Sequence, residues 1–398
     1  MTETRAMRTQ VGIVGAGPAG LVLGRLLERA GIDTVILERR SRSYVEGRVR
    51  AGVLEHGTAD LLEEIGVGDR MRREGMVHRG IELRFDRAGH RIDFEDLTKK
   101  TITVYGQQEV VKDLIVARLA SDLPLAFEAE VTAVSGLTGD RPVIHRGADE
   151  LTCDFVAGCD GGHGVTYGAV PAGAMTRYER TYPFAWLGIL ARAPAAAEEL
   201  IYARHERGFA LHSMRTPEII RMYLQVTPDA DLTDWPDARI WDELNTRLAT
   251  DSGFHLTEGP VLERGVTPMR SLVTEPMRYG RLFLAGDAAH IVPPTGAKGL
   301  NLAVADVRVL ANALIAHYRD GEDRLLDDYS ARCLRRVWRA QRFSSWMTTM
   351  LHRRPDDDEF AHRLQLAELA YVTGSTAAAT SLAENYVGWA VDTSEQGS

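Results

Sequence analysis

The stretch 11–38 constrains the fold most, because a strand, a glycine turn, a helix and a second strand follow each other without a gap. Residues 11–14 predict a short buried strand, and the glycines of the motif G-x-G-x-x-G come next, at Gly15, Gly17 and Gly20. The first glycine suits a tight turn, the second lets a ligand approach the backbone, and the third lets the helix pack on the strand. Free N–H groups at such a helix start attract an anion. We therefore expect a βαβ unit that binds the pyrophosphate of a dinucleotide.

An acidic residue follows the second strand of this unit. Residues 34–37 predict that strand, and Glu38 ends it. An acid about 20 residues after the glycines accepts hydrogen bonds from ribose hydroxyls. The combination favours an adenine dinucleotide whose ribose hydroxyls are free.

Two later fragments also end an apolar strand with glycine and aspartate. Residues 153–157 lead into a glycine-rich loop that contains Asp160, and residues 282–285 lead into Gly286 and Asp287. Acids at the carboxyl ends of strands in an open sheet contact ligands. The fragments are far apart in the sequence, so they can meet only if one sheet gathers all of these strand ends.

Composition limits the partners and the compartment. The 398 residues carry a formal net charge of -9 with both signs spread along the chain, which argues against nucleic acid or an anionic membrane as the main partner. Cys153, Cys159 and Cys333 form an odd set without metal-ligand or redox spacing, so we expect no metal site and a reducing cytoplasm. We find no apolar run near the ~20 residues of a membrane span.

The order of patterns predicts an α/β protein with an inserted α+β region. Helix and strand patterns alternate up to about residue 180, strand patterns dominate up to about Thr267, and helical patterns follow Leu325. We expect a flexible leader at 1–9, a discontinuous Rossmann-like dinucleotide-binding domain at 10–180 and 268–324, a mainly antiparallel β domain at 181–267 that binds the substrate, and a C-terminal helical region at 325–398.

The three glycine fragments together resemble the FAD-dependent aromatic hydroxylases, the class A flavoprotein monooxygenases. A narrower resemblance, carried by residues 47–55, 202–215 and 281–302 and extending over 10–388, is to the branch that acts on 4-hydroxybenzoate. It implies FAD as cofactor, NADPH or NADH as electron donor, and dioxygen as co-substrate. The expected reaction hydroxylates 4-hydroxybenzoate at the 3-position through a flavin hydroperoxide and yields 3,4-dihydroxybenzoate.

The same resemblance implies which side chains handle the aromatic acid. Ser213, Arg215 and Tyr223 would grip the substrate carboxylate, and an Arg with two hydroxyl donors suits that planar group. Tyr202 would take the phenol proton and pass it through Tyr386 toward His78, an order that leads from tyrosine to a histidine near pKa ~6.5. The Pro294 carbonyl would face the substrate hydroxyl, with Thr295 beside it.

For FAD, the resemblance implies a set of residues spread over the whole dinucleotide-binding domain and the β domain. Lys298 would supply positive potential, and Arg221 would help the isoalloxazine ring to swing between an inner and an outer position. The expected FAD residues are Gly15, Gly17, Gly20, Glu38, Arg48, Arg50, Gln107, Asp160, Arg221, Gly286, Asp287, Lys298, Gly299 and Asn301.

The expected site for the nicotinamide donor comprises Arg39, Tyr44, His163 and Arg270. The sequence departs from the family pattern nearby, because Tyr167 stands where an arginine is common and Gly162 where a bulky residue is common. Arginine near residue 39 favours the 2′-phosphate of NADPH, whereas Glu46 repels it. Both donors therefore stay open.

Two alternatives and one assembly state complete the expectations. The pocket could take another small aromatic carboxylate, such as an aminobenzoate, or the chain could be a flavin-binding carrier without turnover. The family implies a homodimer, for which the C-terminal helices offer a surface.

Overall fold

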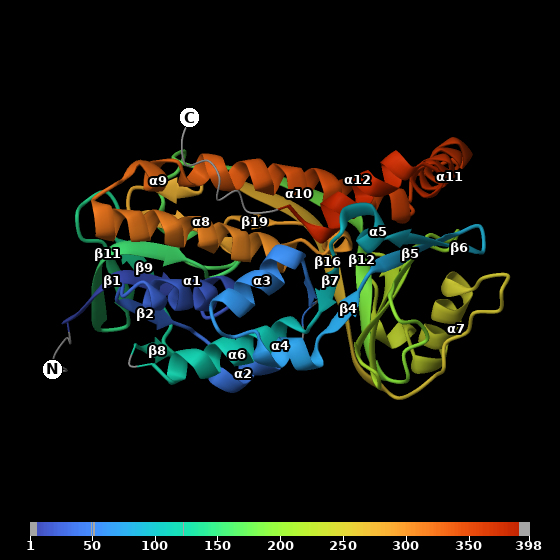
Figure 1. Ribbon diagram of the computed structural model, residues 1–398, viewed down its shortest axis with the longest axis horizontal. Coiled ribbons are helices and arrows are strands. Elements are labelled where there is room, and N and C mark those ends of the chain that lie inside the picture. Colours follow the sequence, from blue (N-terminus) through green and yellow to red (C-terminus); the bar gives the residue numbers. More distant parts are fainter. Residues whose placement is uncertain (1–5, 49, 51, 122, 390–398) are drawn as a thin grey trace.

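The computed structural model describes residues 6–48, 50, 52–121 and 123–389. Two large sheets lie one after the other along the long axis of the molecule, and helices cover both (Figure 1). The predicted α/β class with a mainly antiparallel second sheet and a helical C-terminal region is confirmed. The C-terminal helices are α10 (Tyr329–Leu351), α11 (Glu359–Gly374) and α12 (Thr376–Val387).

The first sheet gathers the three predicted strand ends. Its order is β17 (Arg278–Tyr279), β18 (Leu282–Leu284), β11 (Asp149–Gly158), β1 (Ala6–Val14), β2 (Thr34–Leu37) and β8 (Leu125–Ala126). The strands from β18 to β8 pair in parallel, so their carboxyl ends lie at one edge. Two further strands join this sheet beside β11. Strand β10 (Val143–Arg146) pairs antiparallel with β11, and β9 (Ala133–Ser135) pairs antiparallel with β10.

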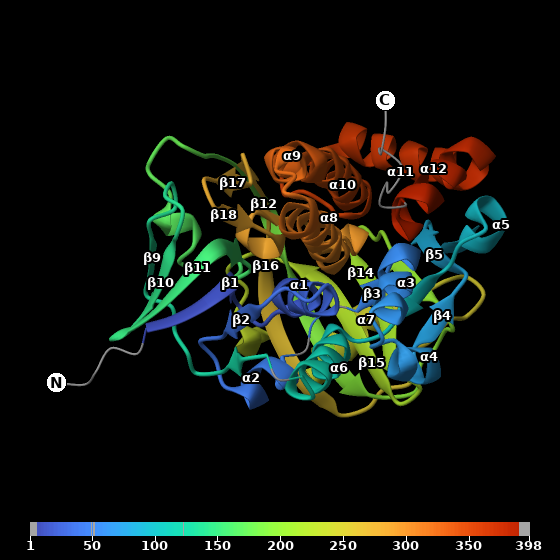
Figure 2. The ribbon, with the colours of Figure 1, turned by 60° about the vertical axis from the view of Figure 1, so that its left-hand side comes forward.

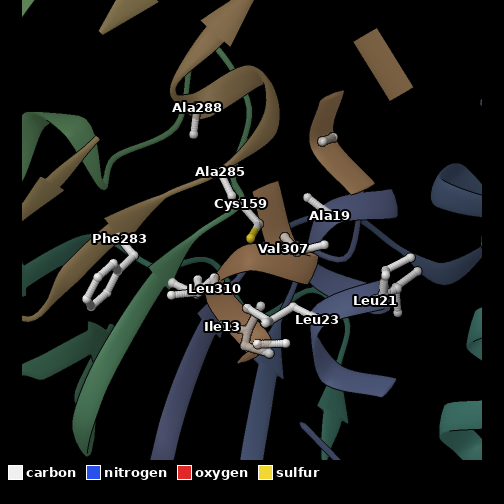
Figure 3. Packing of buried hydrophobic residues seen from close by; sticks show 14 of the residues in the cluster. Ile13, Ala19, Leu21, Leu23, Cys159, Phe283, Ala285, Ala288, Val307 and Leu310 are labelled. Carbon is white, nitrogen blue, oxygen red and sulfur yellow. The ribbon is translucent and has the colours of Figure 1, made fainter. Parts of the chain in front are cut away.

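Helices α1 (Pro18–Arg29) and α8 (Gly299–Asp320) pack together against this sheet. Figure 3 shows Ile13 of β1, Leu23 of α1 and Leu310 of α8 meeting in the core between them. By length and composition α8 could span a membrane, contrary to our expectation that no run is long and apolar enough, but 61% of its apolar window is buried inside the molecule. Its apolar character therefore reflects its position in the core.

One local expectation is corrected at the amino-terminal end. Strand β1 begins at Ala6 and pairs with β11 from there, so residues 6–9 belong to the sheet and not to a flexible leader; residues 1–5 lie outside the described residues. The arginine-rich segment after Glu38 contains helix α2 (Arg42–Gly47), capped by the Ser41 hydroxyl. Helix α6 (Gln107–Leu119) packs beside it (Figure 2).

The second sheet has the order β19 (His290–Ile291), β16 (Val261–Glu275), β12 (Thr176–Arg192), β15 (Ile219–Val226), β14 (Ala210–Thr216), β13 (Leu200–Ala203), β5 (Gly80–Phe85) and β6 (Ala88–Asp93). Strands β12 and β16 extend beyond the predicted limits 181–267, and the hairpin of β5 and β6 joins this sheet from the first half of the chain. The division into domains stays our proposal, with residues 80–93 assigned spatially to the second sheet.

The two faces of the second sheet have different partners. Along β15 every second residue is buried, and Met222 and Leu224 pack toward α7 (Asp237–Leu248) in one apolar cluster. Residues of the opposite face, Tyr202 and Trp186 among them, pack toward α5 (Phe94–Thr98), α10, α11 and α12 in another. A small sheet of β3 (Val53–Leu54), β7 (Ile102–Val104) and β4 (Met76–His78) joins the two halves, flanked by α3 (His56–Glu64) and α4 (Asp69–Glu74); α9 (Arg324–Asp327) precedes α10.

Candidate active site

The three glycines of the first turn meet three different surroundings. Gly15 has φ +106°, and a Cβ there would lie 2.4 Å from the Cys159 carbonyl oxygen. A Cβ on Gly20 would lie 2.0 Å from the Gly15 carbonyl oxygen, whereas a Cβ on Gly17 would meet nothing within 4 Å. Gly15 and Gly20 are therefore required by the fold itself. Gly17 faces open space at the start of α1, where a phosphate can approach the backbone.

Glu38 lies beside this turn at the end of β2. One carboxylate oxygen accepts a hydrogen bond from the Ala16 backbone N–H at 2.9 Å, and the other accepts from the Arg40 N–H at 2.8 Å. The side chain thereby connects the ends of β1 and β2. An ionised carboxylate has about four acceptor positions, so capacity remains for ribose hydroxyls.

The two aspartates differ in their freedom to contact a ligand. Both oxygens of Asp160 accept from Thr166, one from its backbone N–H at 2.9 Å and one from its hydroxyl at 2.6 Å, so this carboxylate closes its own loop. Burial raises its pKa, which the two Thr166 bonds oppose. Asp287 is exposed after Gly286, whose φ is +61°. Asp287 is thus the aspartate available to a cofactor.

The start of α8 carries a buried ion pair that the sequence did not reveal. The Lys298 ammonium donates to Glu55 at 2.7 Å and to the Tyr386 carbonyl oxygen at 2.9 Å, and its side chain is 3% exposed. Burial lowers the pKa of Lys298, and Glu55 opposes this effect. The expected positive potential of Lys298 is therefore largely compensated inside the protein.

Asn301 holds the same segment in place by side-chain hydrogen bonds. Its amide group donates to the Val53 and Ala297 carbonyl oxygens and accepts from the Glu55 N–H at 2.9 Å. Its side chain therefore orders β3 and the start of α8, and Gly299 supplies the first residue of that helix. A ligand at this position would meet backbone that Asn301 holds in place.

The remaining expected FAD residues surround the edge of the first sheet. Arg48 and Arg50 are exposed; partial desolvation and the neighbouring Arg48 lower the pKa of Arg50, while Asp287 raises it. Gln107 opens α6, and Arg221 contacts Glu263 at 3.4 Å from β15. Free cations, an exposed acid and an open glycine turn at one edge fit the diphosphate, ribityl and ribose groups of FAD.

We call Tyr202, Ser213, Arg215, Tyr223, Pro294 and Thr295 the aromatic-acid site. Arg215 donates to the Met214 carbonyl oxygen at 3.1 Å and lies 3.4 Å from the Ser213 hydroxyl, but its buried Nε has no hydrogen-bond partner among the described residues. Burial lowers the pKa of Arg215, Tyr223 raises it, and Arg221 lowers it further. Neither these contacts nor an ion pair within the described chain supplies a carboxylate to this guanidinium.

The strand pairing around Arg215 is irregular. The pairing of β14 with β15 shifts register between Met214 and Thr216, so Arg215 lies in a bulge. The Ser213 hydroxyl donates to the Arg221 carbonyl oxygen at 2.8 Å. Ser213 is therefore not a free donor, and it orients Arg215 in the present arrangement.

Tyr202 and Tyr386 meet as predicted, from β13 and α12. Their hydroxyl oxygens are 2.5 Å apart, and the two side chains are 2% and 1% exposed. Burial raises the pKa of both phenols above the usual range. The second step of the predicted relay is not connected, because neither ring nitrogen of His78 has a hydrogen-bond partner in the described part of the chain. Burial lowers the pKa of His78 to about 4, which Glu199 opposes.

Pro294 and Thr295 lie in the short turn before α8. The Pro294 carbonyl oxygen accepts from the Ala297 N–H at 2.9 Å, which leaves a second lone pair for a substrate hydroxyl. Thr295 is fully buried, and its hydroxyl oxygen is 2.9 Å from that of Thr348 on α10. This contact with α10 was not expected from the sequence.

The expected donor residues fall into two groups. A Cβ on Gly162 would lie 3.0 Å from an Arg270 guanidinium nitrogen, so the loop of His163 lies against Arg270. Arg39 and Tyr44 are exposed on and before α2. Tyr167, where an arginine is common, carries the Arg177 guanidinium 3.3 Å above its ring, so a cation is present there after all.

Three residues of this region were missed: Glu55, Trp186 and Arg177. Trp186 packs against Tyr223 with ring centroids 4.6 Å apart. Glu55 is the last residue of the stretch 47–55 that carries the family resemblance, so the sequence did contain a signal for it. Nothing in the local sequence marks Trp186 or Arg177, because each stands in an ordinary strand pattern of β12.

The chain is similar to several known proteins. The family model described as "FAD binding domain" matches residues 8–344. The p-hydroxybenzoate hydroxylase of Acinetobacter baylyi is 49% identical over 388 residues, which cover 96% of each chain. The crystal structure of p-nitrophenol 4-monooxygenase PnpA from Pseudomonas putida is similar with a TM-score of 0.82 and 20% identity, covering 97% of this chain and 99% of that one. Aklavinone-11 hydroxylase, solved with FAD and aklavinone, has a TM-score of 0.70 and 21% identity, covering 88% and 70%.

Proposed function

Because the chain belongs to the FAD-dependent aromatic hydroxylases and is therefore an FAD-dependent monooxygenase, we propose that its substrate is 4-hydroxybenzoate. The product is 3,4-dihydroxybenzoate, formed with one NAD(P)H, one proton and one dioxygen, with water and NAD(P)⁺ as the other products. FAD, when bound, would supply the hydride acceptor and the means of activating dioxygen. Family membership excludes the flavin-binding carrier without turnover.

The observation that carries the proposal is the Arg215 guanidinium, which has an unpartnered Nε and no anionic partner among the described residues. A buried cation without an anion is unfavourable, and a benzoate carboxylate supplies both the charge and an acceptor for its free Nε. Tyr223 lies on the neighbouring strand, and Tyr202 lies on β13 at the Tyr386 contact. We expect a para-substituted ring whose carboxylate lies at Arg215 to place its hydroxyl at Tyr202.

Tyr202 and Tyr386 handle the phenol proton. Removal of this proton makes the ring electron-rich at the position next to the hydroxyl. Since burial raises the pKa of both tyrosines, both stay neutral at pH 7, and the proton moves as a shift along the hydrogen bond between their hydroxyl groups. The proton then moves toward His78, whose ring nitrogens have no hydrogen-bond partner among the described residues; His78 passes it on and does not retain it, because burial lowers its pKa to about 4.

The electron donor we propose is NADPH. Glu46, the residue expected to repel the 2′-phosphate, forms an ion pair with Arg42 at 2.7 Å within α2. Its charge is thereby neutralised locally, and the exposed Arg39 and Arg40 remain nearby. Arginine pairs well with a phosphate, so a kcat/KM ratio in favour of NADPH over NADH is expected.

We further propose a homodimer formed through α11. Phe360, Leu364 and Tyr371 are 72%, 57% and 60% exposed and follow helical spacing on one side of α11. Figure 1 shows this helix at one end of the molecule. Light scattering of the wild type should give twice the mass of 44.0 kDa, and Leu364→Glu should give the monomer. The three buried free cysteines support the reducing cytoplasm as compartment.

The test of function uses the purified protein with FAD. NADPH and NADH oxidation are measured with 4-hydroxybenzoate, with 4-aminobenzoate and without an acid, and the products are identified by mass spectrometry. Rapid oxidation with 4-hydroxybenzoate and formation of 3,4-dihydroxybenzoate support the proposal. A preference for the aminobenzoate, or a hydroxylated product of another acid only, would reject the proposed substrate.

A further inference from the structure

His352 lies at the carboxyl end of α10 and has no exposed surface. Its ring is stacked with those of Phe184, Phe209 and Trp186, at centroid distances of 4.7, 4.4 and 5.9 Å. A histidine among aromatic rings would ordinarily be a packing residue. The hydrogen bonds of its two nitrogens indicate more.

Both ring nitrogens of His352 have partners of fixed character. Nδ1 is 2.9 Å from the Thr348 carbonyl oxygen, which can only accept, so Nδ1 carries the hydrogen. Nε2 is 2.7 Å from Trp186 Nε1, an indole nitrogen that can only donate, so Nε2 accepts. The two contacts select one neutral tautomer, and burial, which lowers the pKa of His352 to about 3, keeps it neutral.

Each partner of His352 leads to a different side of the aromatic-acid site. Trp186 packs on Tyr223 at 4.6 Å, and Tyr223 interacts with the Arg215 guanidinium. Thr348, whose carbonyl oxygen faces His352 Nδ1, has its hydroxyl oxygen 2.9 Å from that of Thr295. One imidazole thus contacts Trp186, which packs behind the carboxylate-binding end of the site, and Thr348, which contacts the turn that contains Pro294.

We propose that His352 is a positioning residue, which as the neutral Nδ1–H tautomer holds Trp186 behind Tyr223 and the Thr348 segment behind Thr295, and so sets the width of the aromatic-acid site. The inference rests on the proposed function, since the width is read out with 4-hydroxybenzoate. Without the Nε2 acceptor, the Trp186 N–H is buried and unpaired, and the indole tilts to find a partner. Tyr223 and Arg215 then lose their fixed distance to Thr295.

The test compares His352→Leu with His352→Gln. Leucine fills the space without any acceptor, whereas the glutamine carbonyl oxygen can reach the position of Nε2 and accept from Trp186. For each FAD-loaded variant, calorimetry gives the Kd of 4-hydroxybenzoate, and turnover gives KM, kcat and the product formed per NADPH oxidised. We expect a roughly tenfold higher Kd and a lower product yield for leucine, since small misplacements around a site are costly, and a clear recovery for glutamine.

Trp186→Phe tests the same contact from the other side and covers the case in which His352→Leu does not fold. It keeps an aromatic ring against Tyr223 and removes the N–H donor together with part of the indole volume, a loss of volume that the control below shares, and a several-fold higher Kd is expected. The control is Trp241→Phe, a tryptophan 3% exposed in the apolar cluster on the opposite face of the sheet, where the Kd should not change.

The outcomes separate the two levels of inference. Wild-type protein that neither binds nor hydroxylates 4-hydroxybenzoate overturns the proposed function, and this inference with it. Wild-type protein that binds the acid, while His352→Leu and Trp186→Phe bind it equally well and only melt at a lower temperature, overturns the positioning role alone. Equal losses for leucine and glutamine also overturn it, because the acceptor would then not matter.

Discussion

We call the carboxyl-terminal edge of the first sheet, with Gly17, Glu38, Asp160, Asp287 and Asn301, the cofactor edge. It differs from the aromatic-acid site in how its polar side chains are paired. At the cofactor edge, Glu38 and Asp160 hydrogen-bond to the backbone of their own turns, and Asn301 is fully used by neighbouring segments. In and beside the aromatic-acid site, Arg215 Nε and both nitrogens of His78 are buried without partners in the described chain.

This difference indicates two modes of ligand recognition. Where side chains satisfy the backbone, they shape a turn, and a ligand is bound mainly by backbone N–H groups and free charges at its rim. Where buried groups stay unpaired, the protein bears a free-energy cost that a complementary ligand removes on binding. Side-chain deletions should therefore affect ligand binding most in the aromatic-acid site, and added bulk should matter most at the cofactor edge.

The largest effect is expected for Arg215→Ala. The binding free energy of 4-hydroxybenzoate should weaken by about 3 kcal/mol, which raises its Kd roughly a hundredfold, because the substrate carboxylate loses its desolvated partner. The melting temperature of the substrate-free enzyme should not fall, since Arg215 has no anion to lose there. Calorimetry and thermal unfolding measure the two quantities. Arg264→Ala, which removes a surface ion pair with Asp237, is the control. Equal Kd values for the wild type and both variants would contradict the binding of the substrate carboxylate by Arg215.

Next in size is Tyr202→Phe. Loss of proton transfer from the substrate should lower the rate of hydroxylation roughly a hundredfold and divert reduced dioxygen to hydrogen peroxide, with little change in the Kd of 4-hydroxybenzoate. Single-turnover kinetics and peroxide assays measure this. Tyr329→Phe serves as the control, because Tyr329 is also fully buried and donates to the Leu284 carbonyl oxygen away from the site. The same product yield in both variants would remove the relay.

The unpaired His78 should make the protein sensitive to mild acid. Its pKa falls to about 4 in the folded state, below the ~6.5 of the unfolded chain, so between these values the unfolded state binds the proton. Stability is therefore lost as the pH falls through this window. Between pH 7 and pH 5, the wild type should lose about 2 kcal/mol more unfolding free energy than His78→Gln. Urea unfolding at both pH values tests this, and parallel pH profiles would mean that His78 is paired.

The smallest effect, and the one that tests the cofactor edge, is expected for Gly17→Ala. The added methyl group meets nothing within 4 Å in the protein, so the apoprotein should unfold at an unchanged temperature. FAD affinity, measured by flavin fluorescence, should fall by about 1.4 kcal/mol, roughly tenfold, because the methyl group obstructs the pyrophosphate. Gly374→Ala, also without a neighbour within 4 Å, controls for the backbone.

Gly20→Ala should give the opposite result at the same turn. Its Cβ would lie 2.0 Å from the Gly15 carbonyl oxygen, so the folded state itself should be destabilised. If Gly17→Ala binds FAD with unchanged affinity and melts at the normal temperature, the phosphate does not approach that backbone. The proposed difference between the two sites would then be wrong.

Local patterns determined much of this protein. The order of strand, glycine turn, helix and acid in 11–38 fixed a βαβ unit, because glycine conformation and strand periodicity depend on neighbours in the chain. The parallel sheet that gathers the ends of β1, β11 and β18 followed from repeating that pattern. The resemblance of three motifs then named the flavin family.

The pairing of side chains was decided only by the tertiary structure. Lys298 meets Glu55 and Trp186 meets His352 across 243 and 166 residues. Whether a buried charge is neutralised or left for a ligand depends on these distant contacts. A sequence pattern reports which groups are present along the chain, but the free energy of burying each one depends on which partner the fold brings to it.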